Sequence, residues 1–210
     1  ETVQLHNLFN HNMIKGPSIE ELTGLGYLVP AQFYIKNAVA VADAGSDEPM
    51  FDGTTTVHFE TIKSVLDVTF IKNRRGIIYC ASQAEAKKLC GELNQLLSPA
   101  VSSSSSAVEK TDPSVVCVLG ETEHEDRERI FENFHDNDNN LTILVTCATL
   151  IEGFDESLLE WVIIAKVIKS ELQIYQIVGR GLRLAGEDDV RPHNSKKSCL
   201  RAIFLHPVDE

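Results

Sequence analysis

Two arginines stand three residues apart in the string QIVGRGLR, which covers residues 176–183. Placed near the start of a helix, Arg180 and Arg183 would project from one face, because side chains three apart are neighbours on a helix. A planar, permanently charged guanidinium group suits phosphate oxygens. Nucleotide hydrolases use such an arginine to stabilise charge on a transferring phosphoryl group. The alternative interpretation is a surface helix with two solvated arginines.

Other residues of interest lie at the ends of apolar, strand-like runs. In parallel α/β folds, ligands meet the loops at the carboxyl ends of strands. Gly153 would let the backbone approach a ligand closely, and Asp155 could accept a hydrogen bond from a ribose hydroxyl. A glycine turn with a helix cap explains the same two residues. Ser82 is predicted to cap a helix, and helix N-termini bind phosphate; a plain cap is the alternative for Ser82, and for Gly120 with Thr122.

Three of these strings, in their order along the chain, resemble motifs of superfamily 2 helicases. Residues 75–82 (RGIIYCAS) resemble motif IV, residues 143–155 (ILVTCATLIEGFD) resemble motif V, and residues 176–183 resemble motif VI. Their order and spacing match the second RecA-like lobe of these enzymes. The endings EGFD and QIVGRGLR are closest to the branch of type I and type III restriction-enzyme helicase subunits. Residues 16–30 (GPSIEELTGLGYLVP) resemble the passage from lobe 1 into lobe 2 in that branch.

The resemblance implies roles for individual residues. Arg180 and Arg183 would be catalytic and reach the γ-phosphate of ATP from a cleft that faces another lobe, rather than from the core of this one. The ATP-binding residues would be Gln176, Gly179, Glu152, Gly153 and Asp155. The nucleic-acid-binding residues would be Ser82, Gly120, Thr122 and Thr146. Ala148 departs from the pattern, because many relatives carry an acidic residue there, and this puts a contact in that turn in doubt.

A phosphate-binding loop of the form G-x-x-x-x-G-K-[ST] is missing from the sequence, as is a D-E-x-H or D-E-x-D string. The residues that cradle the phosphates of ATP and hold Mg²⁺ are therefore expected in a preceding N-terminal RecA-like lobe of the same protein. No metal site is predicted in this chain. The chain alone is expected not to hydrolyse ATP.

Strand-like and helix-like segments alternate along most of the chain, which predicts a mainly parallel sheet with helices on both faces, a three-layer RecA-like α/β domain. Residues 1–29 are predicted to be a connector from the preceding lobe, and residues 30–210 the domain, with a disordered serine-rich insertion at 98–113. Strands are expected at 33–41, 76–80, 115–119, 141–146, 161–165 and 202–205. Helices are expected at 16–27, 58–72, 82–97, 123–134 and 170–182, with S/T-x-x-E/Q cap pairs at Ser18, Ser82, Thr122 and Ser170.

The composition is that of an ordinary globular domain, with 43% hydrophobic and 24% charged residues among 210. The net charge of −12 argues against a free-standing nucleic-acid binder, so any contact with nucleic acid must be local. The five cysteines form no C-x-x-C pair and are expected to be reduced thiols of an intracellular protein. The compartment (nucleus, mitochondrion or cytoplasm) is left open. No membrane span is expected.

Two functions from different classes remain open. The first is an ATP-dependent helicase or translocase whose substrate is nucleic acid, with double-stranded DNA expected and RNA as the alternative. The second is a degenerate helicase lobe that acts as a non-catalytic interaction module; the acidic charge and Ala148 favour it, whereas the intact Gln176, Gly179, Arg180 and Arg183 oppose it. A small-molecule enzyme would need a complete phosphate loop or catalytic cluster, and the sequence contains neither.

Overall fold

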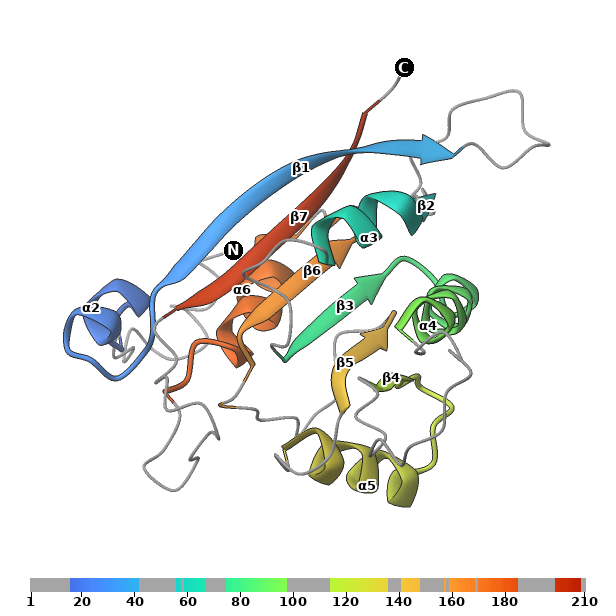
Figure 1. Cartoon of the computed structure of the whole chain (residues 1–210). Coiled ribbons are helices and arrows are strands. Elements are labelled where there is room, and N and C mark those ends of the chain that lie inside the picture. Colours follow the sequence, from blue (N-terminus) through green and yellow to red (C-terminus); the bar gives the residue numbers. More distant parts are fainter. Residues whose placement is uncertain are drawn as a thin grey trace, which may run out of the picture.

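Apolar runs along the chain line up as one seven-stranded sheet in the order β2-β1-β7-β6-β3-β5-β4 (Figure 1). The computed structural model describes residues 16–41, 56–57, 59–66, 75–97, 114–135, 141–147, 157, 159–168, 170–184 and 199–208. The strands are β1 Ala31–Val41, β2 Thr56–Val57, β3 Gly76–Cys80, β4 Ser114–Cys117, β5 Leu141–Thr146, β6 Trp161–Ala165 and β7 Leu200–Val208. Every pairing except that of β1 with β2 is parallel.

Helices cover both faces of this sheet, and a right-handed crossover rule favours that arrangement for parallel strands joined by helices. The helices are α2 Ile19–Gly24, α3 Phe59–Leu66, α4 Gln83–Leu97, α5 His124–His135 and α6 Glu171–Arg180. Side chains of α3 and α4 pack on one face, and side chains of α5 and α6 pack on the other. The three-layer α/β fold predicted from the sequence is confirmed.

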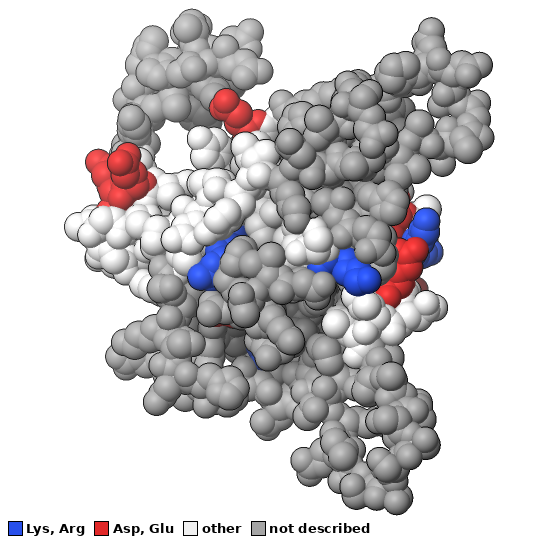
Figure 2. Space-filling view, turned by 45° about the horizontal axis from the view of Figure 1, so that its top comes forward, with Lys and Arg blue, Asp and Glu red and all other residues white. Residues whose placement is uncertain are grey.

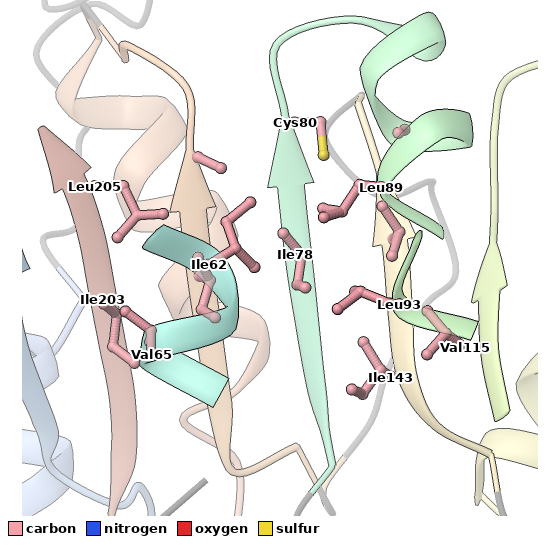
Figure 3. Packing of buried hydrophobic residues seen from close by; sticks show 14 of the residues in the cluster. Ile62, Val65, Ile78, Cys80, Leu89, Leu93, Val115, Ile143, Ile203 and Leu205 are labelled. Atoms are coloured by element: carbon pink, nitrogen blue, oxygen red, sulfur yellow. The ribbon is translucent and has the colours of Figure 1, made fainter. Parts of the chain in front are cut away.

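Each face has its own hydrophobic core. In the first, Ile62 and Val65 of α3 lie over Ile203 and Leu205 of β7, while α4 covers β3 and β5 (Figure 3). In the second, α5 and α6 cover the opposite side chains of the same strands. Every residue of β3 and β6 is buried, because these central strands are covered on both faces, and this is why their sequences GIIYC and WVIIA do not alternate.

Most element boundaries fall within two residues of those predicted. The strands at 76–80, 141–146 and 161–165 end where they were expected, and β7 is longer at both ends than the predicted 202–205. The short strand β2 was not predicted; two residues pairing antiparallel with the end of β1 give no periodic signal. The proposed insertion at 98–113 and residues 1–15 lie outside the described residues.

Helix α2 is closed at both ends by local hydrogen bonds. At its start, the Ser18 hydroxyl accepts from the Glu21 amide at 3.1 Å, and the Glu21 carboxylate accepts from the Ser18 amide at 2.7 Å, which is the predicted capping box. At its end, Gly26 adopts a left-handed φ of 77°, and the Tyr27 amide donates to the Leu22 carbonyl at 2.9 Å. The turn at Gly26 therefore fixes the direction in which the chain continues after α2.

None of the described helices is both long and apolar enough to cross a membrane.

Candidate functional site

Helix α6, predicted at 170–182, carries Arg180 as its last residue and does not include Arg183, so the two arginines do not lie near the start of a helix. It begins after Ser170 and ends at Arg180, so Arg183 lies beyond the last helical residue. The amide of Gly181 donates to the Val178 carbonyl at 3.0 Å, which closes the helix in a tight turn. A Cβ atom on Gly181 would lie 2.6 Å from Leu200 Cδ1, so a larger residue here would force the buried Leu200 side chain to move. Spacing alone predicted a shared helical face, and the glycine stop prevents it.

The two arginines differ in exposure. Arg183 is exposed, whereas Arg180 is half-buried. Burial raises the pKa of the Tyr79 hydroxyl, and the positive charge of Arg180 opposes this rise. Because Tyr79 belongs to the second hydrophobic core, Arg180 reaches toward the body of this lobe.

The other predicted ATP-binding residues divide into two sets. Gln176 is exposed on α6 and Gly179 is half-buried three residues further along. A Cβ built on Gly179 would meet nothing within 4 Å, so no packing in this chain requires a glycine there. Glu152, Gly153 and Asp155, together with Ala148, lie outside the described residues.

Thr146 ends β5 at the carboxyl edge of the sheet, opposite Tyr79 of β3. Its side chain is fully buried, and its hydroxyl has no hydrogen-bond partner in the described part of the chain. Leaving a buried hydroxyl without a partner costs about 1–3 kcal/mol.

Lys166 follows β6 at the same edge of the sheet and contacts one residue from each of the segments 75–82 and 143–155. Its ammonium group donates to the Cys147 carbonyl at 3.1 Å and lies 5.9 Å from the centre of the Tyr79 ring. Burial lowers the pKa of Lys166, because the half-buried position disfavours the charged form. In the sequence, Lys166 and Lys169 shortly precede residues 176–183, where they could form a local basic patch. Lys166 instead points its charge at a backbone carbonyl, and Lys169 lies outside the described residues.

Ser82 precedes α4 and acts as its cap, as predicted. Its hydroxyl accepts from the Glu85 amide at 3.2 Å, and the Glu85 carboxylate accepts from the Ala81 amide at 3.1 Å. A carboxylate therefore already occupies part of the helix start where a phosphate was expected to bind. This arrangement supports the interpretation as a plain cap and leaves the predicted nucleic-acid contact untested.

Gly120 and Thr122 belong to a closed turn after β4. The Thr122 hydroxyl accepts from the Leu119 amide at 2.9 Å, so it stabilises the turn and does not cap α5. Arg127 of α5 stabilises this turn, because its guanidinium group donates a hydrogen bond to the Thr122 carbonyl at 3.0 Å. Gly120 is exposed and has open space around it.

Charge around this turn is mixed. Glu121 forms an ion pair with Lys87 of α4 at 2.5 Å, and Glu123 and Glu125 are exposed beside it. With the top of Figure 1 turned forward, basic residues lie near the middle of the view and also at its right margin, where acidic residues lie beside them (Figure 2). The described surface in this view carries scattered cations and no continuous basic stripe, which agrees with local contacts to nucleic acid.

The structure places the predicted residues in two regions. Ser82, Gly120, Thr122 and Thr146 lie at or just beyond the carboxyl ends of β3, β4 and β5. Helix α6 starts at this edge and runs back, so that Gly181 contacts Leu200 and Leu159, which lie at the amino ends of β7 and β6. Arg183 therefore lies toward the opposite edge. The predicted residues that the structure describes therefore lie on two separate surfaces.

Two contacts around these surfaces were missed by sequence reasoning. They are the hydrogen bond from Lys166 to Cys147 and the antiparallel bridge that pairs Leu28 with Arg183. Both join residues far apart in the sequence, and neither leaves a periodic or spacing signal. In the described part of the chain, no group of three or more His, Cys, Asp or Glu side chains is arranged to hold a metal ion.

Comparison with known families gives a match over residues 58–185 to the family described as helicase conserved C-terminal domain. This match covers more than half of the chain. A comparison with curated proteins gives no significant match.

Solved structures share the fold. A fragment described as an HsdR subunit of a type I restriction enzyme from Vibrio vulnificus YJ016 superposes with a TM-score of 0.67 and 22% identity, covering 96% of this chain and 36% of that one. The ATP-dependent type ISP restriction-modification enzyme LlaBIII bound to DNA gives a TM-score of 0.61 and 16% identity, covering 92% and 13%. The C-terminal domain of the DEAD-box protein Dbp5 gives 0.50 and 15%, covering 85% and 77%. The chain thus spans about a third, or less, of the two restriction enzymes.

Proposed function

We propose that this chain, which belongs to the helicase conserved C-terminal domain family, is the second RecA-like lobe of an ATP-dependent helicase or translocase. In this proposal ATP binds between the chain and a preceding lobe of the same protein. That preceding lobe supplies the phosphate loop and the residues that hold Mg²⁺. The chain contributes arginines to the shared site and contacts nucleic acid at the carboxyl edge of its sheet.

The observation that carries the proposal is the end of helix α6. Arg183 is exposed just beyond the helix, and Gln176 and Gly179 lie on the preceding turns. Gly179 has open space around its Cα although glycine disfavours a helix by roughly 0.5–1 kcal/mol relative to alanine. Packing within this chain does not require a glycine at this position. The close approach of another lobe or of a nucleotide would explain it.

Within the shared site, Arg183 would stabilise the charge that develops on the transferring γ-phosphoryl group. Its fork of donors can contact two oxygens at once, which a lysine cannot do. Gln176 would bind the nucleotide from the same surface. Arg180, half-buried near Tyr79, would combine a contact to phosphate with packing against its own lobe.

In this proposal nucleic acid binds at the other surface, which lies at the carboxyl ends of β3, β4 and β5. The placement of Ser82, Gly120 and Thr146 together at or just beyond the carboxyl ends of β3, β4 and β5 is the observation that favours it. The DNA bound in the LlaBIII structure supports DNA, and we take double-stranded DNA as the expected substrate and RNA as the alternative. Because the net charge is −12, most of the affinity would come from other parts of the protein.

The test is nucleic-acid-stimulated ATP hydrolysis by the protein that contains both lobes. Arg183→Ala should lower kcat by roughly 10³ to 10⁵, the range for removal of an arginine finger. Arg183→Lys should not restore it, and ATP binding should weaken much less than turnover. Arg129→Ala is a matched control, because Arg129 is an exposed arginine of α5 paired with Asp126 at 2.7 Å.

Three further outcomes decide between the functions considered. Hydrolysis that is unaffected in Arg183→Ala would remove that residue from the mechanism. Steady ATP hydrolysis by this chain alone, abolished by Arg180→Ala, would contradict the shared site. A preceding lobe without a phosphate-loop lysine, together with no ATP hydrolysis, would favour the interaction module.

A further inference from the structure

The segment that follows helix α2 is joined directly to the backbone that carries Arg183. Leu28 and Arg183 form an antiparallel β-bridge. The Val29 amide donates to the Leu182 carbonyl at 2.8 Å, a short and well-formed hydrogen bond. Sequence positions about 150 residues apart are thus held together by main-chain pairing at the end of α6.

Packing holds the same segment from a second side. Val29 is 3% exposed and belongs to the core cluster that contains Leu182 and Leu200. The Pro30 carbonyl accepts from the Leu200 amide at 2.9 Å, which joins the segment to the start of β7. Residues 28–30 therefore lie between the end of α6 and the sheet. They are hydrogen-bonded to Leu182 on one side and to Leu200 of β7 on the other.

Arg183 depends on this segment in a way that Arg180 does not. Arg180 is the last residue of α6, and the helix fixes its backbone. Arg183 lies beyond the last helical residue, in the antiparallel bridge with Leu28, and the hydrogen bond from the Val29 amide to the Leu182 carbonyl ties the backbone next to it to this segment. The tight contact of Gly181 with Leu200 fixes the direction in which the chain leaves the helix.

Helix α2, at the other end of this connection, is held less firmly. None of its residues is buried, so the helix can shift against the domain without opening a core. Its end is rigid, because the turn at Gly26 closes it with two hydrogen bonds. When α2 moves, Leu28 should therefore move with it, because the hydrogen-bonded turn between them resists bending.

We propose that the segment Leu28–Pro30 is the positioning element of Arg183 and transmits the placement of helix α2 to that arginine. This proposal rests on the proposed function, in which Arg183 reaches the nucleotide and α2 follows a preceding lobe. Movement of the preceding lobe then changes the position of Arg183 through the main-chain bridge. The arginine is placed for the reaction in one arrangement of the lobes and withdrawn in another.

The proposal is tested by removing the Val29 amide, which donates to the Leu182 carbonyl, while the neighbouring residues are kept. In the protein with both lobes, Val29→Pro deletes the amide that donates to Leu182. We expect kcat for ATP hydrolysis to fall about tenfold to a hundredfold, the scale for misplacing a catalytic group by an ångström, with KM for ATP changed less than about threefold. Val29→Ala, which keeps the amide but loses part of the packing, should lower kcat less than Val29→Pro.

A second proline gives a matched control. Leu28→Pro puts the same residue one position earlier and retains the Val29 amide and its bond to Leu182. It should affect kcat much less than Val29→Pro. Equal losses of kcat in Leu28→Pro and Val29→Pro would show that any local distortion suffices, and would overturn the positioning role.

Combination with Arg183→Ala separates this proposal from the proposed function. If Val29 acts through Arg183, Val29→Pro should cause no further loss of kcat in the Arg183→Ala background. A full additional loss would mean that the segment acts elsewhere. If Arg183→Ala alone leaves kcat unchanged, the proposed function fails first. If Arg183→Ala lowers kcat and Val29→Pro does not, the positioning role fails by itself.

Hydrogen exchange gives a readout that does not depend on any variant folding. The Val29 amide should exchange slowly in the free protein, since it is buried and bonded. Binding of a non-hydrolysable ATP analogue with Mg²⁺ to the protein with both lobes should change its exchange rate by at least about threefold if lobe closure acts on the bridge. An unchanged rate with the analogue bound would contradict the coupling.

Discussion

Among the residues that the structure describes, the buried hydroxyl group of Thr146 has no hydrogen-bond partner, which allows a direct test of its role. Thr146→Val has nearly the same shape and removes the unsatisfied group. We expect it to raise the free energy of unfolding by about 1 kcal/mol, because the desolvation cost of the hydroxyl disappears. In the protein with both lobes, it should reduce the stimulation of ATP hydrolysis by nucleic acid.

Thr146→Ser is the control, because it retains the hydroxyl and loses one methyl group. It should be less stable than the wild type and keep most of the stimulation. Urea unfolding measures the first property and steady-state ATP hydrolysis the second. A Thr146→Val protein that is destabilised would show that the hydroxyl has a partner in the folded chain.

At the level of single residues, helix caps were predictable only in part. Ser18 and Glu21 form the expected box, and Ser82 accepts the amide of Glu85. Ser170 precedes α6 as expected, yet its side chain makes no cap hydrogen bond, because its backbone carbonyl already accepts the Gln173 amide at 3.1 Å. A cap motif specifies which bonds are possible, and the backbone geometry selects among them.

Helix α6 carries a prediction that separates stability from function. Gly179→Ala should stabilise the isolated chain by about 0.5–1 kcal/mol, because alanine favours the helix and the added Cβ meets open space. The same change should impair ATP hydrolysis by the protein with both lobes if a nucleotide or the other lobe approaches there. Thermal unfolding of the chain and kcat of the full protein are the measurements.

Gly91 provides the matched control for this substitution. It lies in α4, is exposed, and likewise has nothing within 4 Å of a built Cβ. Gly91→Ala should give a similar gain in stability with unchanged ATP hydrolysis. If both alanine variants hydrolyse ATP normally, the approach of a ligand to Gly179 is excluded.

Among the elements, buried strands were the most predictable and their order in the sheet the least. The runs GIIYC and WVIIA are apolar throughout, which only a strand covered on both faces requires. The adjacency of β1 and β7 joins the first and last strands and leaves no local signal. The end of α6 was misplaced for a related reason, because contact of Gly181 with Leu200 decides where the helix stops.

On the scale of the whole molecule, the two surfaces are joined through the sheet itself. Strand β6 lies between Leu159, which a Cβ atom on Gly181 would meet at 3.2 Å, and Lys166, which donates a hydrogen bond to the Cys147 carbonyl. A rigid parallel sheet of this kind keeps the two surfaces at a fixed separation. Sequence motifs predicted that both surfaces exist, whereas their placement at opposite ends of α6 follows from the antiparallel return of that helix against β6.

The whole chain should lose stability in alkali, and the direction follows from its buried thiols. Burial raises the pKa of Cys80, Cys90 and Cys117, the last to about 12, and it also raises the pKa of Tyr79. The unfolded chain ionises these thiols near their ordinary pKa, while the folded chain keeps them protonated. The folded state then holds more protons, so the free energy of unfolding falls as pH rises.

The loss should begin above about pH 9, where free thiols ionise, and steepen toward pH 11. The well-buried thiol of Cys80 should contribute up to about 1.4 kcal/mol per pH unit, and the more exposed Cys117 less. Lys166 acts in the opposite direction, because its lowered pKa means that the unfolded chain holds the extra proton until about pH 10.5. Urea unfolding under reducing conditions at pH 8, 9 and 10 would measure the slope. Cys80→Ala should be less stable at pH 8 but lose less between pH 9 and 10, and an unchanged slope would remove Cys80 as its source.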